Sequence, residues 1–419
     1  MVERERETET PPAGFLSGTF RSLRVRNFRL FVGGQLISGI GSWMAMVAGP
    51  WLVWELTHSG VMLGLDTLFG SLPILLVGAW GGLIADRFDN RLAQIWTQSA
   101  YCVVVLALWA LVVTDVVQVW MVFVDSFLLG IVNAIDMPVR QSFYLEMVGP
   151  EDLTNAMSLN TATFTGTRIV GPVIAGALIG VFGVGPVFLV DGLSYLAVVA
   201  ALLAMRVSEL RPRERVPRGK GQVREGVRYV WRTLDLRLPM LLMLVVFLFA
   251  YNFMVFMPLM AVRTFHGDAA TLGSMLSLFG IGSLTGALLM ASRASRPSIS
   301  RMIALAFAVA GLSIALAVSP ALPVAWIVLP FLGAAYISFP ISGNSTLQLT
   351  SAPEMRGRVM SLYTVVFLGS TPIGGPLAGF VGQHLGPRIG VAGGAAIGAT
   401  AAAATVLALR RRRRASGSQ

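Results

Sequence analysis

Hydrophobic residues fall in long, nearly uninterrupted runs, separated by short polar connections along most of the chain. A helical run of roughly 20 apolar residues crosses the hydrocarbon core of a bilayer with its backbone hydrogen bonds satisfied internally. Twelve runs are long enough, so the sequence predicts an all-α membrane protein with twelve transmembrane helices. We expect them over residues 29–55, 60–85, 92–114, 118–139, 156–182, 187–206, 239–263, 271–292, 300–318, 322–346, 357–383 and 388–409.

The twelve runs form two sets of six, separated by one long polar connection. This predicts a tail over 1–28, an N-terminal bundle over 29–206, a linker over 207–238, a C-terminal bundle over 239–409 and a basic tail over 410–419. Internal repetition supports two pseudo-symmetric halves, since PEDLTNAMSLN from Pro150 and PEMRGRVMSLY from Pro353 share five residue types at an offset of 203. Transporters are often built from such repeats.

The linker contains GQVREGVRYVWRTL, in which apolar residues recur at helical spacing. Such a segment can lie along the membrane surface or form a solvated linker helix. The sequence favours neither.

Basic residues lie almost entirely on one side of the predicted topology. All 32 Lys and Arg residues except Arg168, Arg263 and Arg388 fall before the first run, after the last, or in every second connection. The positive-inside rule then places both termini in the cytoplasm of a multi-pass inner-membrane protein. The net charge of +11 therefore reflects topology and indicates no nucleic-acid partner. Residues 410–414 add attraction to anionic membrane lipids.

The connection after the second run reads GGLIADRFDNR. It resembles the signature loop of the major facilitator superfamily, with a glycine, an aspartate four residues later, an arginine next and a basic residue near the end. The matching positions are Gly82, Asp86, Arg87 and Arg91. The sequence departs from the pattern at Asp89 and Asn90.

The form ADRFD, together with RNFRLF, PWLVWELTHSG and PVRQSFYLEMV, is similar to the drug-exporter branch of this superfamily, which includes macrolide and siderophore exporters and drug:proton antiporters. The resemblance covers nearly the whole chain and implies the twelve-helix fold in two six-helix bundles. It also implies a gating role for the loop. We expect Asp86 to face the positive N-terminus of the helix that starts near Gly357, with Arg140 as a possible ion-pair partner. The alternative is an ordinary charged loop.

The fifth run contains RIVGPVIAG, which resembles the antiporter motif of the same superfamily. Gly176 and Gly180 form a GxxxG pair that allows close helix approach. Gly171 and Pro172 are the Gly-Pro of the motif, and Pro172 leaves the carbonyl of Arg168 without its helical partner, so the helix can bend. Arg168 lies too far from either headgroup layer to face lipid and should face a cavity or a polar partner. The motif therefore predicts a charge at the transport path, or a packing helix whose arginine serves an internal network.

Acidic residues also interrupt the runs. Carboxyl groups away from water can bind and release a proton near neutral pH, as proton-coupled export requires. Asp66 and Asp125 are the coupling candidates because their helices line the cavity in the superfamily fold, although both can instead sit in a solvated vestibule. We assign Asp136 and Glu146 to the inner gate and Asp191 to structure.

The substrate cavity should combine adaptable apolar surface with a few polar groups. Each candidate can instead face lipid or serve packing. In the first helix, relatives often carry an acid or amide where this chain has a serine. The candidates are Ser42, Tyr251, Asn252, Met254, Tyr336, Asn344 and Tyr363.

The inventory of reactive residues argues against an enzyme. His58, His266 and His384 show no metal-ligand spacing, Cys102 is the single cysteine, and no GxxxxGK loop occurs. We therefore expect no metal or cofactor. The sequence predicts a transporter, most simply a monomer, that exports hydrophobic or amphipathic small molecules in exchange for protons by alternating access. The alternatives are a siderophore or lipid exporter and, in another class, a non-transporting membrane sensor or assembly partner.

Overall fold

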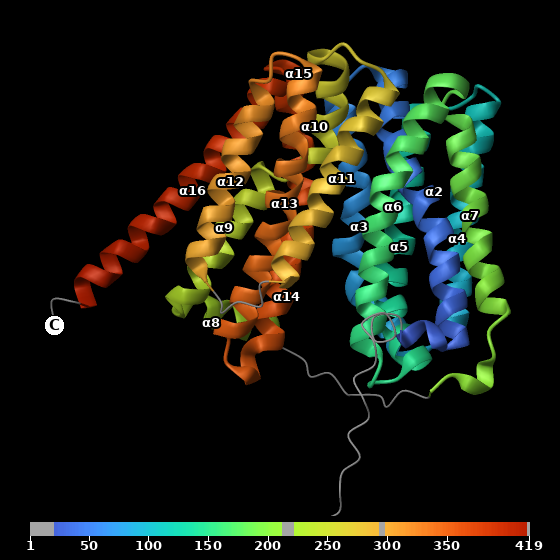
Figure 1. The fold of residues 1–419 in the computed structure, drawn as a ribbon, viewed down its shortest axis with the longest axis horizontal. Helices are drawn as coiled ribbons and strands as arrows, with labels where there is room; N and C mark the ends of the chain where they lie inside the picture. Colours follow the sequence, from blue (N-terminus) through green and yellow to red (C-terminus); the bar gives the residue numbers. More distant parts are fainter. Residues whose placement is uncertain (1–20, 212–221, 293–297, 417–419) are drawn as a thin grey trace, which may run out of the picture.

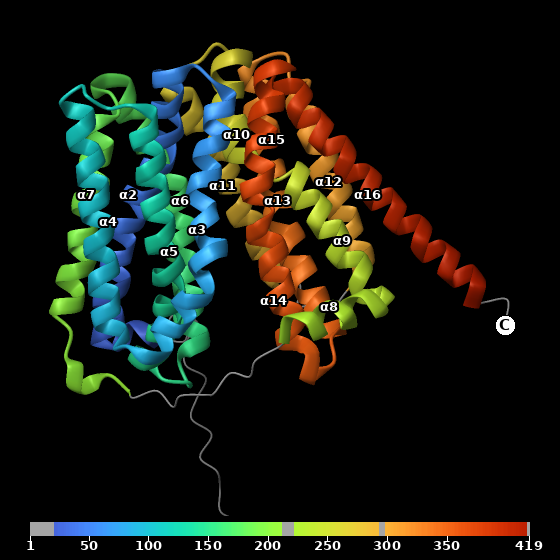
Figure 2. The same ribbon diagram turned by 180° about the vertical axis from the view of Figure 1, so that it is seen from behind.

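A computed structural model describes residues 21–211, 222–292 and 298–416, without the side chains of 79–86, 222–224 and 413–416 (Figures 1 and 2). Within these ranges the chain is helical, and 12 helical segments are long and apolar enough to cross a membrane. This confirms the predicted fold class.

The N-terminal bundle holds the first six spans. Its elements are η1 (Arg21–Arg24), α2 (Arg26–Thr57), α3 (Gly60–Arg87), α4 (Asn90–Val113), α5 (Val119–Val148), α6 (Leu153–Phe182), α7 (Gly185–Leu203) and the short η2 (Val207–Glu209). The linker helix α8 (Gln222–Arg232) comes next. The C-terminal bundle follows with α9 (Leu234–Phe249), α10 (Phe253–Leu259), η3 (Met260–Thr264), α11 (Ala269–Ser292), α12 (Ile299–Ala317), α13 (Leu322–Thr350), α14 (Pro353–Gly369), α15 (Thr371–His384) and α16 (Pro387–Ser416).

Two predicted runs are broken rather than continuous helices. The run over 239–263 consists of α9, α10 and the π-helical turn η3, and the run over 357–383 consists of α14 and α15. At the first break the Asn252 amide donates to the carbonyl oxygen of Leu248 at 2.8 Å and so competes with the helical ladder. At the second, Pro372 brings no N–H to the first turn of α15. Hydrophobic periodicity carries neither signal.

The two bundles meet along two helix pairs, α6 with α11 and α15 with α3. Glycines permit the contact. A Cβ atom on Gly176 would lie 3.0 Å from the Cα of Ala270, and one on Gly64 would lie 2.6 Å from the carbonyl oxygen of Gly375. Because α6 and α15 carry the repeated glycines of the two halves, equivalent motifs form equivalent interfaces.

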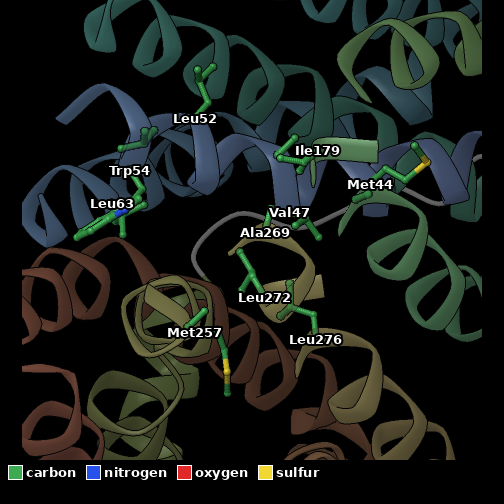
Figure 3. Close-up of a cluster of buried hydrophobic side chains, with 14 of the residues drawn as sticks. Met44, Val47, Leu52, Trp54, Leu63, Ile179, Met257, Ala269, Leu272 and Leu276 are labelled. Carbon is green, nitrogen blue, oxygen red and sulfur yellow. The ribbon is translucent and has the colours of Figure 1, made fainter. Parts of the chain in front are cut away.

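These contacts lie toward one side of the molecule. We call the side from which α2 starts and at which α16 ends the terminal side, and the opposite side the distal side (Figures 1 and 2). Figure 3 shows an apolar cluster between the two bundles. It combines Met44, Val47, Leu52, Trp54, Leu63 and Ile179 of the N-terminal bundle with Met257, Ala269, Leu272 and Leu276 of the C-terminal bundle. We call this cluster the distal seal.

The predicted amphipathic segment of the linker is helical and forms α8, which packs against α14. Glu225 pairs with Arg358 at 2.5 Å, and the backbone N–H of Ala352 donates to the hydroxyl of Tyr229 at 3.2 Å. The linker helix is therefore docked on the C-terminal bundle, and its placement at the membrane surface stays a prediction.

Candidate functional site

A polar cluster covers the distal seal and joins the two bundles. Arg263 donates to the carbonyl oxygen of His58 at 3.2 Å, and its guanidinium lies 5.2 Å from the ring centre of Trp54. The side-chain oxygen of Gln383 accepts from Arg263 at 3.0 Å and from the backbone N–H of Gly60 at 2.7 Å. His58, Trp54 and Gly60 belong to the N-terminal bundle. We call this cluster the distal latch.

Asp268 begins α11 next to the distal latch. Its carboxylate accepts from the backbone N–H of Thr271 at 2.9 Å and from the hydroxyl of the same residue at 3.0 Å. These hydrogen bonds hold the pKa of Asp268 below its ordinary value, because they favour the charged form. The carboxylate also suits the positive end of the α11 dipole.

The described part of the signature loop is bound within the N-terminal bundle. Asn90 donates to the carboxylate of Glu146 on α5 at 2.6 Å, and Arg91 donates to the carbonyl oxygen of Leu202 on α7 at 2.8 Å. Arg87 is exposed. Gly82 and Asp86 fall where the structure describes the helix but not the side chains, so the predicted Asp86 contact lies outside the described residues.

Arg140, the expected partner of Asp86, forms an ion pair with Asp136 one turn earlier on α5. Asp136 is fully buried, and its other oxygen accepts from Gln94, Thr97 and Gln98 of α4 at 2.8–3.0 Å. This carboxylate therefore has a cation and three donors, as a buried charge requires.

Arg168 has no such set of partners. Its guanidinium lies between Trp43 of α2 and Phe279 of α11, 5.2 Å from each ring centre. Among the described residues, no side chain or carbonyl accepts a hydrogen bond from it, and no carboxylate pairs with it. The predicted placement at a cavity or a polar partner stays a prediction, but the charge lies where the two bundles meet.

The two proton-coupling candidates lie on neighbouring helices. Ser126 donates to the Asp66 carboxylate at 2.5 Å, whereas one carboxyl oxygen of the buried Asp125 has no hydrogen-bond partner among the described residues. Asp125 interacts electrostatically with Asp66 and also with Asp191 on α7. One carboxyl oxygen of Asp191 likewise has no described partner. The N-terminal bundle therefore contains three grouped acids, none of which forms an ion pair with a described cation.

The structure brings some of the cavity candidates together and separates others. Tyr251 stacks on Tyr336 with ring centres 3.6 Å apart, and its hydroxyl donates to the carbonyl oxygen of Tyr336. Asn344 accepts from Gln348 at 2.7 Å, and its side chain also forms a hydrogen bond with that of Tyr363. These two pairs lie within the C-terminal bundle.

The other cavity candidates have structural contacts. Ser42 lies in the N-terminal bundle, 3.0 Å from the hydroxyl of Tyr195. Asn252 is buried at the helix break described above, and Met254 is half-buried against the main apolar cluster.

Sequence reasoning missed several residues of these clusters. Arg263 was visible as one of three basic residues off the positive-inside pattern, which is a usable signal. Gln383, Phe279 and the link between Asp191 and Asp125 carry no signal in a single sequence, because each depends on contacts between distant helices.

Comparison with known proteins now adds to this geometry. Residues 17–418 match the family described as transmembrane secretion effector. The chain belongs to this family. The family is part of the major facilitator superfamily and consists of transporters rather than enzymes, which confirms the resemblance inferred from the motifs.

Individual relatives agree with this membership. The chain is 27% identical over 375 residues to the multidrug efflux pump Tap of Mycolicibacterium fortuitum, covering 85% of this chain and 90% of that one. It is 22% identical to the staphyloferrin A transporter of Staphylococcus aureus, and there the match spans 62% of this chain and 66% of the relative. The chain shares its fold with a bacterial homologue of the human lysosomal transporter Spinster, whose structure is inward-facing and unoccupied. The TM-score is 0.73 at 15% identity, and the match covers 92% of this chain and 96% of that one. The chain is therefore a multi-pass membrane transporter of the major facilitator type.

Proposed function

We propose that this transporter exports hydrophobic or amphipathic small molecules in exchange for protons by alternating access. The terminal side is cytoplasmic in this proposal, because the basic residues gather there, and the membrane is the bacterial inner membrane. The printed names of the relatives, a multidrug efflux pump and a staphyloferrin A transporter, support export of drugs or siderophores.

The observation that carries the proposal is the one-sided contact between the bundles. The distal side holds the seal and the latch, while the described residues of the signature loop bind only their own bundle. Such a molecule is open toward the cytoplasm. To reach the outward-open state, the two bundles rotate against each other and the distal latch separates. Asp86 and its loop then close the cytoplasmic side.

Asp66 and Asp125 are the proposed proton sites. Neither carboxyl group has a described cationic partner, unlike Asp136, so no neighbouring positive charge holds it in the charged form. Each can therefore bind a proton and release it again. Binding and release of that proton would change the charge of the buried carboxyl group and so the free energy of burying it. This change would shift the balance between the cytoplasm-open and the outward-open state.

Everted membrane vesicles test the proposal. An imposed proton gradient should drive uptake of a fluorescent drug such as ethidium or of a macrolide in vesicles that contain the protein. Asp66→Asn and Asp125→Asn should abolish the gradient dependence while keeping passive exchange, and Asp86→Asn should slow both. Asp235→Asn, which alters an exposed pair with Arg412, is the matched control and should transport normally. Folded, inserted protein that moves none of these compounds would support the sensor alternative.

A further inference from the structure

The strongest unassigned feature is the charge of Arg168, which lies between the bundles without a described counter-ion. A guanidinium presents five N–H donors, and Arg168 is half-buried, so donors without a protein acceptor can bind water or a ligand. Cation–π contact with Trp43 and Phe279 engages the faces of the guanidinium and does not use its N–H donors. Arg140, in the same bundle, has both Asp136 and Gln35 as acceptors. Arg168 is therefore built as a charge that awaits an acceptor.

A polar face of α6 leads from the terminal side to this charge. Thr154, Ser158, Thr161 and Thr165 precede Arg168 at spacings of four, three, four and three residues, so all lie on one side of the helix. Thr154, Ser158 and Thr161 are exposed, and the hydroxyls of Ser158, Thr161 and Thr165 donate to carbonyl oxygens one turn earlier in α6. Among the described residues these three hydroxyls have no hydrogen bond to another helix, so this face suits a water-filled path.

The path ends at Arg168 because the bundles close immediately beyond it. The hydroxyl of Ser277 on α11 donates to the carbonyl oxygen of Ile169 at 3.1 Å, and a Cβ atom on Gly280 would lie 3.2 Å from the carbonyl oxygen of Arg168. Farther on, Gly176 meets Gly273. A molecule that enters from the terminal side therefore stops beside the guanidinium.

Aromatic surface surrounds the same position. Trp43 contacts Phe164 edge to face with ring centres 5.5 Å apart, and Phe279 contacts Tyr336 at 5.2 Å. Phe164 is 57% exposed, so its ring is available to an incoming apolar group. Since Trp43 and Phe279 belong to different bundles, a ligand beside Arg168 would touch both.

We propose that Arg168 binds the anionic group of an amphipathic substrate, a carboxylate, sulfonate or phosphate, while the apolar body of the substrate packs against Phe164, Trp43 and Phe279. This inference rests on the proposed export function and names its preferred cargo. A carboxylate or phosphate matches the fork of the guanidinium and supplies the missing acceptors. A cationic substrate would be repelled at the same point.

The test compares three probes with one apolar body: pyrenebutyrate, its uncharged methyl ester, and cationic pyrenebutylamine. Binding to purified protein in nanodiscs is followed by energy transfer from tryptophan to pyrene. Arg168→Gln should weaken binding of pyrenebutyrate by about tenfold or more, as loss of a charge-assisted hydrogen bond implies. The ester should change by less than about twofold on the same reasoning, because it lacks the charge. The ratio between variant and wild type cancels partition of each probe into lipid.

Two further variants sharpen the result. Arg168→Lys should restore part of the preference, since it keeps the charge but loses the fork. Arg388→Gln is the matched control: it removes an arginine at the start of α16 that donates to the carbonyl oxygen of Ser319 within the C-terminal bundle, and should leave all three affinities unchanged.

Equal loss for carboxylate and ester in Arg168→Gln would overturn the proposal, because it would indicate altered shape rather than lost charge recognition. Wild-type protein that binds the amine as tightly as the carboxylate would overturn it as well, even if Arg168→Gln fails to fold. If Arg168 shows no preference for the anionic probe but the proton gradient still drives drug uptake, the anion site is refuted and the export function stands. If the anionic probe binds preferentially but no compound is transported, the anion site stands and the export function is refuted.

Discussion

The distal latch should control the balance between the two states of the transporter, and Arg263→Ala tests this. The substitution removes a hydrogen bond from a charged donor to His58, worth about 1.5–3 kcal/mol, and a cation–π contact with Trp54, worth about 0.5–1 kcal/mol. Both contacts exist only while the distal side is closed. Because water replaces part of them on opening, we expect a net shift of about 2 kcal/mol, or roughly 30-fold in the ratio of the two states. A distal-open population of about 1% would rise to roughly a quarter.

Distances between paired spin labels measure this shift. In a Cys102→Ala background, labels at Val116 and Val318 report on the distal side of the two bundles, and labels at Phe88 and Leu349 report on the terminal side; all four positions are exposed. Arg263→Ala should add a longer distance to the first pair and a shorter distance to the second. Arg388→Ala, whose bond stays within one bundle, should add neither. Unchanged distributions in folded Arg263→Ala would refute the assigned role of the latch.

Three further outcomes follow from the packing and the charges. Gly64→Leu should prevent distal closure and reduce transport, because its Cβ would lie 2.6 Å from the Gly375 carbonyl oxygen, whereas Gly311→Leu, with open space around it, should transport normally. Asp136→Asn should lower stability by about 3–5 kcal/mol in thermal unfolding, since it leaves Arg140 without its counter-ion, and an unchanged melting temperature would contradict this. Asp268→Ala should cost about 0.5–2 kcal/mol at pH 7 through loss of a helix cap. Because folding lowers the pKa of Asp268, the charged carboxylate stabilises the fold above pH 3.8, the ordinary pKa, and this stabilisation is lost as the pH falls through the lower folded pKa. The difference in melting temperature between wild type and Asp268→Ala should therefore become smaller in acid. A difference that grows in acid would be inconsistent with the capping role.

Hydrophobic runs determine the spans because a bilayer imposes both length and helicity. The repeat could also be found, since Gly176 and Gly379 keep the same offset as the motifs that precede them. Helix breaks were not predictable, because the hydrogen bond from Asn252 to Leu248 leaves no trace in an apolar pattern.

The candidate site was foreseen only where a residue is anomalous by itself. Arg168 stands out because a charge in the middle of a span is costly and needs a reason. Its aromatic neighbours Trp43 and Phe279 come from helices far away in sequence, and their arrangement depends on how the bundles pack. The ion pair of Arg140 with Asp136 follows from their spacing of one turn on α5, whereas the expected contact of Arg140 with Asp86 stays a prediction.

Access to the level of Arg168 from one side at a time is the central claim. In the Cys102→Ala background, Thr165→Cys places a single cysteine one turn before Arg168 on the polar face of α6, where a membrane-impermeant thiol reagent can be applied in everted and in right-side-out vesicles. We predict that this cysteine reacts from the cytoplasmic side and becomes reactive from the outside when Arg263→Ala is added. A cysteine that is protected from both sides in both proteins would contradict the account.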